Sequence, residues 1–456
     1  MINAVLIFKR DHRKELSLIK LLFGFFPLYL LFVFSESFGA LSELPVQSHS
    51  PLNNDGPWGI ELQHQIVPLK MRVHIFPHTL KKDYRHGEPD NPKKVILYSE
   101  GSIELSGKTL GKKVSFSYDK ENGLQMDIRG VKEKKEGPLL LRSTEPIFIL
   151  REKNPKKTHQ YIGEIEIRSG EKGLQIINHL LIENYLRGVV PNEVVKNWPM
   201  DVLKVQAVAA RTYAYYHGLR KKENSFWDVD DTARYQVFTG LTHVAEKTDL
   251  AVAETSGEIM TFKNRVIKAY FHSYSGGKTS SAKKIFGEMD NKYCIGNKEI
   301  FTREELLDEI NPKFAWIVRW KTDEIKQLNF LKLLKNNSIT QKKFYDFEES
   351  LNFTLKEERD PKGFNSLKKL WIIQGERKEF LKVNEIRKLL GHSKIYSYWF
   401  YFGKSDLDSF RLSGHGWGHH VGMSQWGAYM MAKNYGYNYK DILNHYYKNI
   451  SFQSME

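Results

Sequence analysis

The sequence predicts an α+β fold, because strand patterns and helix patterns occupy different parts of the chain. Residues 67–183 hold short alternating or apolar runs separated by turn residues such as Asn122-Gly123, which is typical of strands and hairpins. Helical spacing takes over from residue 184 to about residue 218, and strand-like runs return at residues 259–262 and 266–271. We therefore expect a mostly β N-terminal region followed by mixed helices and strands.

The N-terminus, residues 1–40, has the pattern of a secretion signal peptide or a membrane anchor. Basic residues precede the apolar run Leu21–Phe34, and small residues follow it as far as Ala40. The run has 14 residues, fewer than the roughly 20 of a spanning helix, which favours cleavage. The basic flank also suits an anchor that contacts the membrane through residues 21–34. The protein is therefore expected to work outside the cytoplasm, in the periplasm or cell envelope.

Residues 41–66 are rich in Pro, Asn, Ser and Gly and are expected to form a flexible lead-in. The β region that follows is predicted from its alternating runs. These runs are Lys94–Tyr98, Lys113–Tyr118, Ile147–Leu150 and Tyr161–Arg168.

The helical stretch around residue 200 is expected to be buried. Pro199 lies where a first-turn proline is tolerated, and Asn197 is a candidate N-cap. Arg211 and Tyr213 could face either a functional site or a structural ion pair, and the structural interpretation is favoured. One helical stripe consists of Leu203, Ala207, Ala210 and Ala214.

Residues 300–395 have a different composition, with many charges. Helix-forming segments are expected at residues 303–310 and 324–335. Strands are expected near residues 370–373 and 396–402.

The composition indicates a globular protein and narrows its partners. The chain has 41% apolar and 27% charged residues, which excludes wholesale disorder. Its net charge is +15, carried by scattered lysine pairs without a basic helix or nucleic-acid motif, so we expect no nucleic-acid partner. A basic surface suits an anionic envelope, and solvation of exposed faces explains it equally well. The single Cys294 excludes an internal disulfide and is expected to be a small buried residue.

Glu193 is the strongest candidate for a catalytic group. It is a lone carboxylate among apolar neighbours, including Val190, Pro191 and Val194. Partial desolvation disfavours the charged form of a carboxyl group and raises its pKa, so Glu193 could deliver a proton as a general acid. The alternative is that Glu193 lies in the first turn of a helix and merely complements the helix dipole.

The segment Gly414–Gly427 contains five glycines, three histidines and two tryptophans in fourteen residues. So many glycines allow positive φ and close approach of the backbone, which favours a loop that lines a groove over a helix. Trp417 and Trp426 could stack on sugar rings, and Ser424 and Gln425 could bind hydroxyl or acetamido groups. The alternative is that both tryptophans are core residues and the glycines serve tight turns.

Seven short motifs follow one another along most of the chain, and they resemble, in order, those of the SpoIID/LytB family of bacterial cell-wall proteins. The resemblance implies a SpoIID-like catalytic core at residues 184–299 and 396–456, with residues 300–395 as an inserted lobe. The motifs are Met71–Ile75, Tyr185–Glu193, Val205–Ala214, Gln236–Gly240, Phe271–Thr279, Gly414–Ala428 and His445–Tyr447.

The resemblance also implies an activity on peptidoglycan. Glycosidases usually need two carboxylates, but a single acid suffices when the substrate supplies its own nucleophile. A lytic transglycosylase would use Glu193 as general acid and base on MurNAc-GlcNAc strands stripped of peptides, leaving 1,6-anhydro-MurNAc ends. Candidate substrate-binding groups are Tyr213, Tyr235, His272, Ser275, Lys278, His415, Trp417, His419 and Gln425.

Two other functions remain open from the sequence. The LytB side of the family suggests a wall-binding protein without catalytic activity that stimulates an N-acetylmuramoyl-L-alanine amidase. The string His415, His419 and His420 suggests a zinc hydrolase, but the interleaved glycines disfavour the helix that would group these side chains. In some family members, the resemblance implies a zinc site built partly on a cysteine, at the position where this chain has Tyr235. We therefore expect neither a metal nor another cofactor, with peptidoglycan, and an amidase or another envelope protein, as partners.

Overall fold

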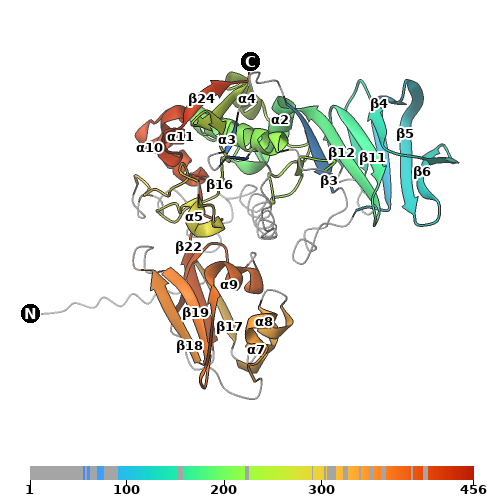
Figure 1. Cartoon of the computed structure of the whole chain (residues 1–456). Coiled ribbons are helices and arrows are strands. Elements are labelled where there is room, and N and C mark those ends of the chain that lie inside the picture. The colour runs from blue at the N-terminus through green and yellow to red at the C-terminus, as the bar shows by residue number, and fades with distance from the viewer. Residues whose placement is uncertain are drawn as a thin grey trace, which may run out of the picture.

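The computed structural model describes residues 55–56, 59–61, 69–76, 91–150, 158–220, 225–289, 291–301, 305, 315–321, 327–337, 340–348, 354–360, 366–391, 394–403 and 409–455 (Figure 1). The predicted signal or anchor, most of the predicted lead-in and nearly all of the predicted helix at 303–310 lie outside these ranges. None of the helices in the described part of the chain is long and apolar enough to cross a membrane.

The N-terminal region is built on an extended and mostly antiparallel sheet, in which only β13 pairs in parallel, with β3, among the described strands (Figure 1). The predicted α+β fold with a mostly β N-terminal region is therefore confirmed. Its strands follow the order β13-β3-β12-β11-β8-β4-β5-β6-β7, with β9 and β10 paired beside β4. The strands are β3 (Lys70–Ile75), β4 (Lys94–Leu105), β5 (Lys108–Asp119), β6 (Gly123–Ile128), β7 (Val131–Lys135), β8 (Leu139–Arg142), β9 (Ile147–Leu150), β10 (His159–Tyr161), β11 (Glu164–Ser169), β12 (Leu174–Leu181) and β13 (Val229–Asp230).

The central unit is built around helix α3 (Met200–Leu219), which packs against α2 (Ile182–Glu193), α4 (Glu246–Glu254) and a five-stranded sheet of order β1-β2-β15-β14-β24. Two strands of this sheet, β1 and β2, lie within the stretch predicted as a lead-in. The predicted strand at 266–271 is interrupted: only its ends are in strands, β15 and β16. The remaining elements are β1 (Asp55–Gly56), β2 (Gly59–Glu61), β14 (Glu258–Phe262), β15 (Arg265–Val266), β16 (Phe271–His272), α5 (Ala282–Phe286), β23 (Met423–Ser424), α10 (Gln425–Tyr435), α11 (Tyr439–Tyr446) and β24 (Ser451–Ser454).

Helix α3 is almost entirely buried, as its small apolar residues predict. The four residues of the predicted stripe have no exposed surface, and Cys294 is buried as expected. The predicted cap at Asn197 is wrong: α3 begins directly after Pro199, whose fixed φ starts the helix, and no side chain caps it. The structural interpretation of Arg211 is confirmed, because its buried guanidinium donates to both carboxylate oxygens of Glu183, at 2.7 and 2.8 Å.

The lobe between residues 315 and 415 has its own hydrophobic core, separate from that of the central unit. Two three-stranded sheets, β17-β22-β21 and β18-β19-β20, form most of it, and it projects from the central unit in Figure 1. The predicted helix at 324–335 corresponds to α7. The elements are β17 (Ala315–Lys321), α7 (Gln327–Asn336), α8 (Gln341–Phe344), β18 (Thr354–Asp360), β19 (Ser366–Gln374), β20 (Arg377–Lys382), α9 (Val383–Leu390), β21 (Trp399–Gly403) and β22 (Ser409–His415).

Candidate functional site

Glu193 is the last residue of α2, and its surroundings are as apolar as the sequence predicts. Val189, Val190, Pro191 and Val194 are all buried. Glu193 as a residue keeps some exposed surface, so it is only half-buried. Its Oε1 accepts a hydrogen bond from the backbone N–H of Val237 at 2.9 Å. The carboxyl group therefore lies at the meeting point of α2 and the segment that follows β13.

Burial raises the pKa of Glu193 from 4.5 to about 7, while the Val237 N–H and the side-chain amide of Gln425 lower it. The position at the C-terminal end of α2 also disfavours a negative charge, because the helix dipole is negative there. The alternative placement in the first turn of a helix is wrong, since six residues separate Glu193 from the start of α3 at Met200. Glu193 thus has the pKa of a group that exchanges protons near neutral pH.

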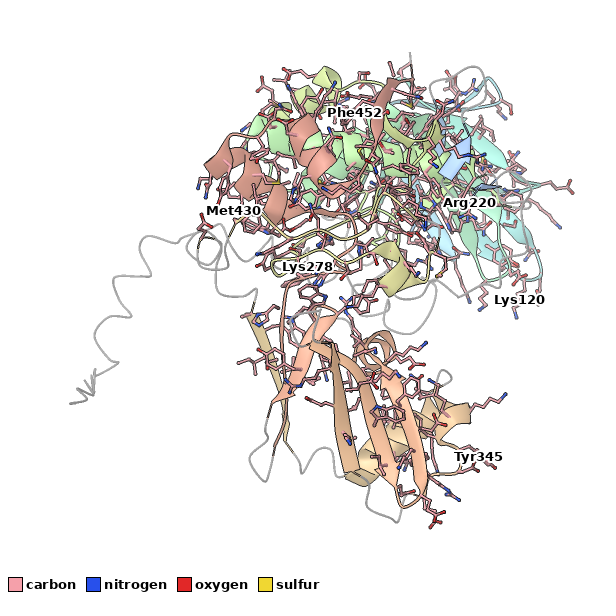
Figure 2. All side chains as sticks on the ribbon, turned by 60° about the vertical axis from the view of Figure 1, so that its left-hand side comes forward. Lys120, Arg220, Lys278, Tyr345, Met430 and Phe452 are labelled. Carbon is pink, nitrogen blue, oxygen red and sulfur yellow. The ribbon has the colours of Figure 1, made fainter. Side chains whose placement is uncertain are left out.

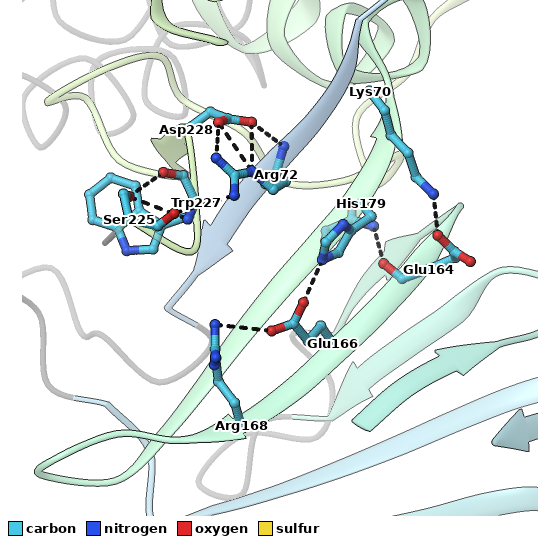
Figure 3. A network of polar contacts seen from close by, with 10 residues as sticks. Lys70, Arg72, Glu164, Glu166, Arg168, His179, Ser225, Trp227 and Asp228 are labelled. Atoms are coloured by element: carbon cyan, nitrogen blue, oxygen red, sulfur yellow. Dashed lines mark hydrogen bonds and ion pairs between the residues drawn. The ribbon is translucent and has the colours of Figure 1, made fainter. Parts of the chain in front are cut away.

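The segment that carries Val237 is held in place by two ion pairs in which the carboxylate is buried. Asp230 pairs with Arg234 at 2.8 Å, and one of its carboxylate oxygens also accepts from the hydroxyl and the N–H of Thr232, at 2.6 and 2.9 Å. Asp228, just upstream, binds the guanidinium and the backbone N–H of Arg72 on β3 (Figure 3). These contacts attach the segment to the N-terminal sheet and so hold the Val237 N–H, the hydrogen-bond donor to Glu193, in position.

The start of α10 brings Gln425 to the same place. Strand β23 pairs in parallel with β16, which fixes the entry to the helix. Ser424 caps the helix by accepting from the N–H of Gly427 at 3.2 Å. Gln425 donates to Oε1 of Gln206, on α3, at 3.2 Å and lies close enough to Glu193 to lower its pKa. Of the predicted binding residues, Gln425 is the one whose side chain acts on Glu193.

A second buried carboxyl group, Glu299, was missed by the sequence analysis. The hydroxyls of Ser275 and Tyr446 donate to its two carboxylate oxygens at 2.6 and 2.7 Å. Burial raises its pKa to about 7, and these hydroxyls together with Ser424 lower it. Ser275, predicted to bind substrate, is therefore occupied by Glu299 and fully buried.

The predicted tyrosines lie in an aromatic group around His217. The ring of Tyr213 is 4.5 Å from that imidazole and the ring of Tyr235 is 5.0 Å from it. Tyr213 is buried, which raises its pKa well above 10, whereas Tyr235 is partly exposed and burial raises its pKa to about 12. Both phenols are therefore neutral near pH 7 and can offer hydrogen bonds but not charge.

The predicted loop over Gly414–Gly427 is confirmed only for residues 416–422, where three glycines and His420 have positive φ. The prediction is wrong at both ends, because Gly414 and His415 end β22, and Gln425–Gly427 begin α10 after the short strand β23.

His272 and His419 lie in the protein interior, with their rings 5.5 Å apart. Both are bound to the backbone of Val421, whose carbonyl accepts from His272 and whose N–H donates to His419. Burial lowers the pKa of His272 to about 3 and that of His419 well below 6.5. Both imidazoles are neutral.

The other predicted binding residues lie toward the lobe. Trp417 is buried and stacks on Tyr396 with the ring centroids 4.6 Å apart, which is the core role foreseen as the alternative. His415 ends β22, half-buried, with Nε2 at 3.4 Å from the hydroxyl of Tyr401. Lys278 is partly exposed on the side of the central unit that faces the lobe (Figure 2). Trp426 instead packs edge-on against Trp198 at 4.8 Å.

The described residues contain no group of three His, Cys, Asp or Glu side chains placed to hold a metal ion. The histidine string does not converge: His415 lies on β22, whereas His419 and His420 point into the interior. One nitrogen of His419 already accepts from the Val421 N–H at 3.1 Å. The zinc hydrolase interpretation therefore gains no support from the geometry of these side chains.

Glu193→Gln is expected to stabilise the fold at alkaline pH. The pKa of Glu193 is about 7 in the folded state and near 4.5 when unfolded, so its favourable contribution is fully present below about pH 4.5 and is lost as the pH rises through about 7. Glutamine resembles the protonated acid and cannot ionise, so the variant should keep this stability at high pH. The resulting gain in the free energy of unfolding should be about 1–3 kcal/mol for a half-buried group. Thermal unfolding at about pH 5 and pH 8 should show a gain only at the higher pH. The exposed Glu171→Gln is the control, and equal melting temperatures at pH 8 would contradict the expectation.

Comparison with known proteins identifies a match to the family model described as stage II sporulation protein over residues 170–262, a stretch that includes both Glu193 and Val237. An uncharacterized protein of Brachyspira hyodysenteriae is 31% identical over 330 residues, which cover 72% of this chain and 80% of that protein. Stage II sporulation protein D of Bacillus amyloliquefaciens is 27% identical over 61% of this chain and 76% of its own length. An amidase enhancer of Bacillus subtilis is 26% identical over 59% of this chain but only 40% of its own length.

Proposed function

Because this chain belongs to the SpoIID/LytB family of bacterial cell-wall proteins, we propose that it is an extracytoplasmic lytic transglycosylase that cleaves the MurNAc-GlcNAc strands of peptidoglycan. The observation that carries the proposal is the state of Glu193. Glu193 is a half-buried residue, and its carboxyl group has a pKa of about 7 and accepts a hydrogen bond from the N–H of Val237. Such a group can give up a proton and take it back at neutral pH.

The reaction needs only one carboxyl group. Glu193, protonated, donates its proton to the oxygen that links C1 of MurNAc to GlcNAc, and the C1–O bond breaks as GlcNAc leaves with a free hydroxyl. The carboxylate that remains then accepts the proton of the MurNAc C6 hydroxyl, and that oxygen bonds to C1. The product is a 1,6-anhydro ring, Glu193 is protonated again, and no water is consumed.

Two groups beside Glu193 support this proton cycle. The Val237 N–H and the Gln425 amide both favour the carboxylate, which offsets part of the effect of burial. The partly exposed Tyr235, Lys278 and His415 are proposed to bind sugar substituents. The other candidate binding residues are buried, so we propose that they support the substrate-binding residues from the protein interior. They are Tyr213, His272, Ser275, Trp417 and His419.

The proposed function also includes a substrate and a cellular location. Strands stripped of peptides are the proposed substrate, and the net charge of +15 suits an anionic envelope. A signal peptide or anchor at residues 1–40 would deliver the protein there.

A second function is favoured by one specific observation, the similarity to an amidase enhancer. In this alternative the protein binds the wall and stimulates an N-acetylmuramoyl-L-alanine amidase without cutting glycan. Since the match covers less than half of that enhancer, the stimulating role is kept as the alternative.

Mass spectrometry of reaction products distinguishes the two functions. We expect the purified protein to release fragments with 1,6-anhydro-MurNAc ends from amidase-treated glycan strands, and fewer or none from strands that retain their peptides. An amidase assay with and without the protein runs in parallel. If no glycan is cut while the amidase rate rises, the transglycosylase proposal is overturned in favour of the alternative.

A further inference from the structure

Glu299 is a buried carboxyl group for which the proposed reaction has no use. Its side chain is completely buried. The Ser275 hydroxyl binds one carboxylate oxygen at 2.6 Å and the Tyr446 hydroxyl binds the other at 2.7 Å. Ser275 belongs to the segment after β16 and Tyr446 ends α11, so Glu299 joins two parts of the chain that are distant in sequence. A buried carboxyl group whose two oxygens both accept hydrogen bonds makes the segments that donate to it more rigid.

The first turn of α10 is built directly over this pair. A Cβ atom added to Gly427 would lie 2.0 Å from the Tyr446 hydroxyl and 3.0 Å from both carboxylate oxygens of Glu299. Only glycine leaves room for the Tyr446–Glu299 hydrogen bond at this point of the helix.

The same contacts reach Gln425. The cap residue Ser424 accepts from the N–H of Gly427 at 3.2 Å and from the N–H of Ser275 at 3.3 Å. Ser424 is also among the hydroxyls that act on Glu299. Gln425 follows Ser424 directly, and its amide is the side-chain group that acts on Glu193. A continuous chain of contacts thus runs from Glu299 through the start of α10 to Glu193.

We propose that Glu299 is a positioning residue, which fixes the first turn of α10 and so holds the amide of Gln425 against Glu193. This inference rests on the proposed function, because it assigns Glu299 a part in tuning the acid. Glu299 is not itself a catalytic residue, since its buried side chain cannot touch substrate. Its charge does not act on Glu193 directly either: among the described residues, the pKa of Glu193 responds to burial, Val237 and Gln425.

The test is the pH profile of Glu299→Gln. Gln425 lowers the pKa of Glu193, so loosening Gln425 should raise it. The activity of an acid that must be protonated is lost as the pH rises through its pKa. The alkaline limb of kcat/KM should therefore move up by about 1 pH unit, with kcat lowered about tenfold and KM changed less than about twofold. The double variant with Gln425→Ala should show no larger shift than Gln425→Ala alone. An unchanged limb, or a shift that adds to that of Gln425→Ala, overturns the inference.

Two further variants guard against a simple loss of folding. Tyr446→Phe removes one hydroxyl and should move the limb in the same direction by a smaller amount. The matched control is Glu288→Gln, because Glu288 also accepts from a tyrosine hydroxyl, that of Tyr270, and from the amide of Asn291 at 3.1 Å. Within the described part of the chain, Glu288 binds Tyr270, Lys268 and Asn291, none of which belongs to α10, so its variant should leave the limb in place. A shift in Glu288→Gln equal to that in Glu299→Gln would overturn the inference.

A readout without activity separates this inference from the proposed function. The carboxyl titration of Glu193 can be followed by NMR of protein labelled at the glutamate carboxyl carbon, with the Glu193→Gln variant identifying the signal. If wild-type protein makes no anhydro product, the proposed function fails. The positioning role still stands if Glu299→Gln raises the titration midpoint of Glu193, and it fails if the midpoint is unchanged.

Discussion

Glu193→Gln is expected to lower the release of 1,6-anhydro-MurNAc ends by about 1,000-fold. Glutamine keeps the shape of the side chain and can still accept from the Val237 N–H, but it has no proton to give to the leaving oxygen. Binding of the protein to glycan should be unchanged, because the packing around α2 is retained. Quantitative mass spectrometry of products and a sedimentation assay with wall sacculi measure the two effects separately.

The wild-type rate of cleavage should depend on pH, since the reaction needs the protonated form of Glu193. Because the pKa of Glu193 is about 7, the proton needed for cleavage is present below that pH. The rate should fall about tenfold per pH unit above it. Glu171→Gln, at an exposed position, should reproduce the wild-type profile. If Glu193→Gln retained a tenth or more of the rate, or if the alkaline limb were absent, another group would have to be the acid.

Gly188→Ala is expected to destabilise the fold by about 3 kcal/mol and to lower activity about 100-fold. A Cβ at residue 188 would lie 2.4 Å from the carbonyl oxygen of Gly240 and 2.5 Å from the ring of Phe238. The backbone at Gly240 cannot move away from α2, because it already packs tightly on its other side. A Cβ added to Gly240 would lie 2.0 Å from the carbonyl oxygen of Gln160. Helix α2 must therefore shift, and Glu193 at its end would lose the Val237 N–H.

Thermal unfolding and the product assay together check this expectation. Asn184→Ala is the control, since it changes a partly exposed residue of the same helix without adding volume. A variant that melts near the wild-type temperature with full activity would show that α2 can move away from the segment after β13 without consequence. Loss of stability with a normal rate per folded molecule would show that the position of Glu193 does not depend on this contact.

The sequence predicted those features that depend on neighbours along the chain. The stripe of Leu203, Ala207, Ala210 and Ala214 follows directly from helical periodicity, and its burial is confirmed. The raised pKa of Glu193 follows from the valines beside it in the sequence, which are buried and desolvate its carboxyl group. The glycines predicted a loop over residues 414–427, because glycine adopts positive φ without strain, and the structure has that loop at residues 416–422 only.

Features that depend on segments brought together by folding could not be foreseen. Glu299 stands between Lys298 and Ile300 and has no apolar setting in the sequence. Its hydroxyl partners Ser275, Ser424 and Tyr446 belong to three separate parts of the chain, which only the fold brings together. The end of α2 was not foreseen either: Glu193 is the last residue of α2, whereas the sequence allowed it to lie in the first turn of a helix, and α3 begins only at Met200.

The separate core of the lobe has a consequence for evolution. Residues such as Leu331, Ile372 and Leu381 pack among themselves and not against the helices around Glu193. The lobe returns to the central unit through β22 and the stacked pair of Tyr396 and Trp417. Mutations and length changes within the lobe can therefore accumulate without repacking α2 or α3. Selection can therefore act on the lobe and on the residues around Glu193 separately, and the two parts can change at different rates.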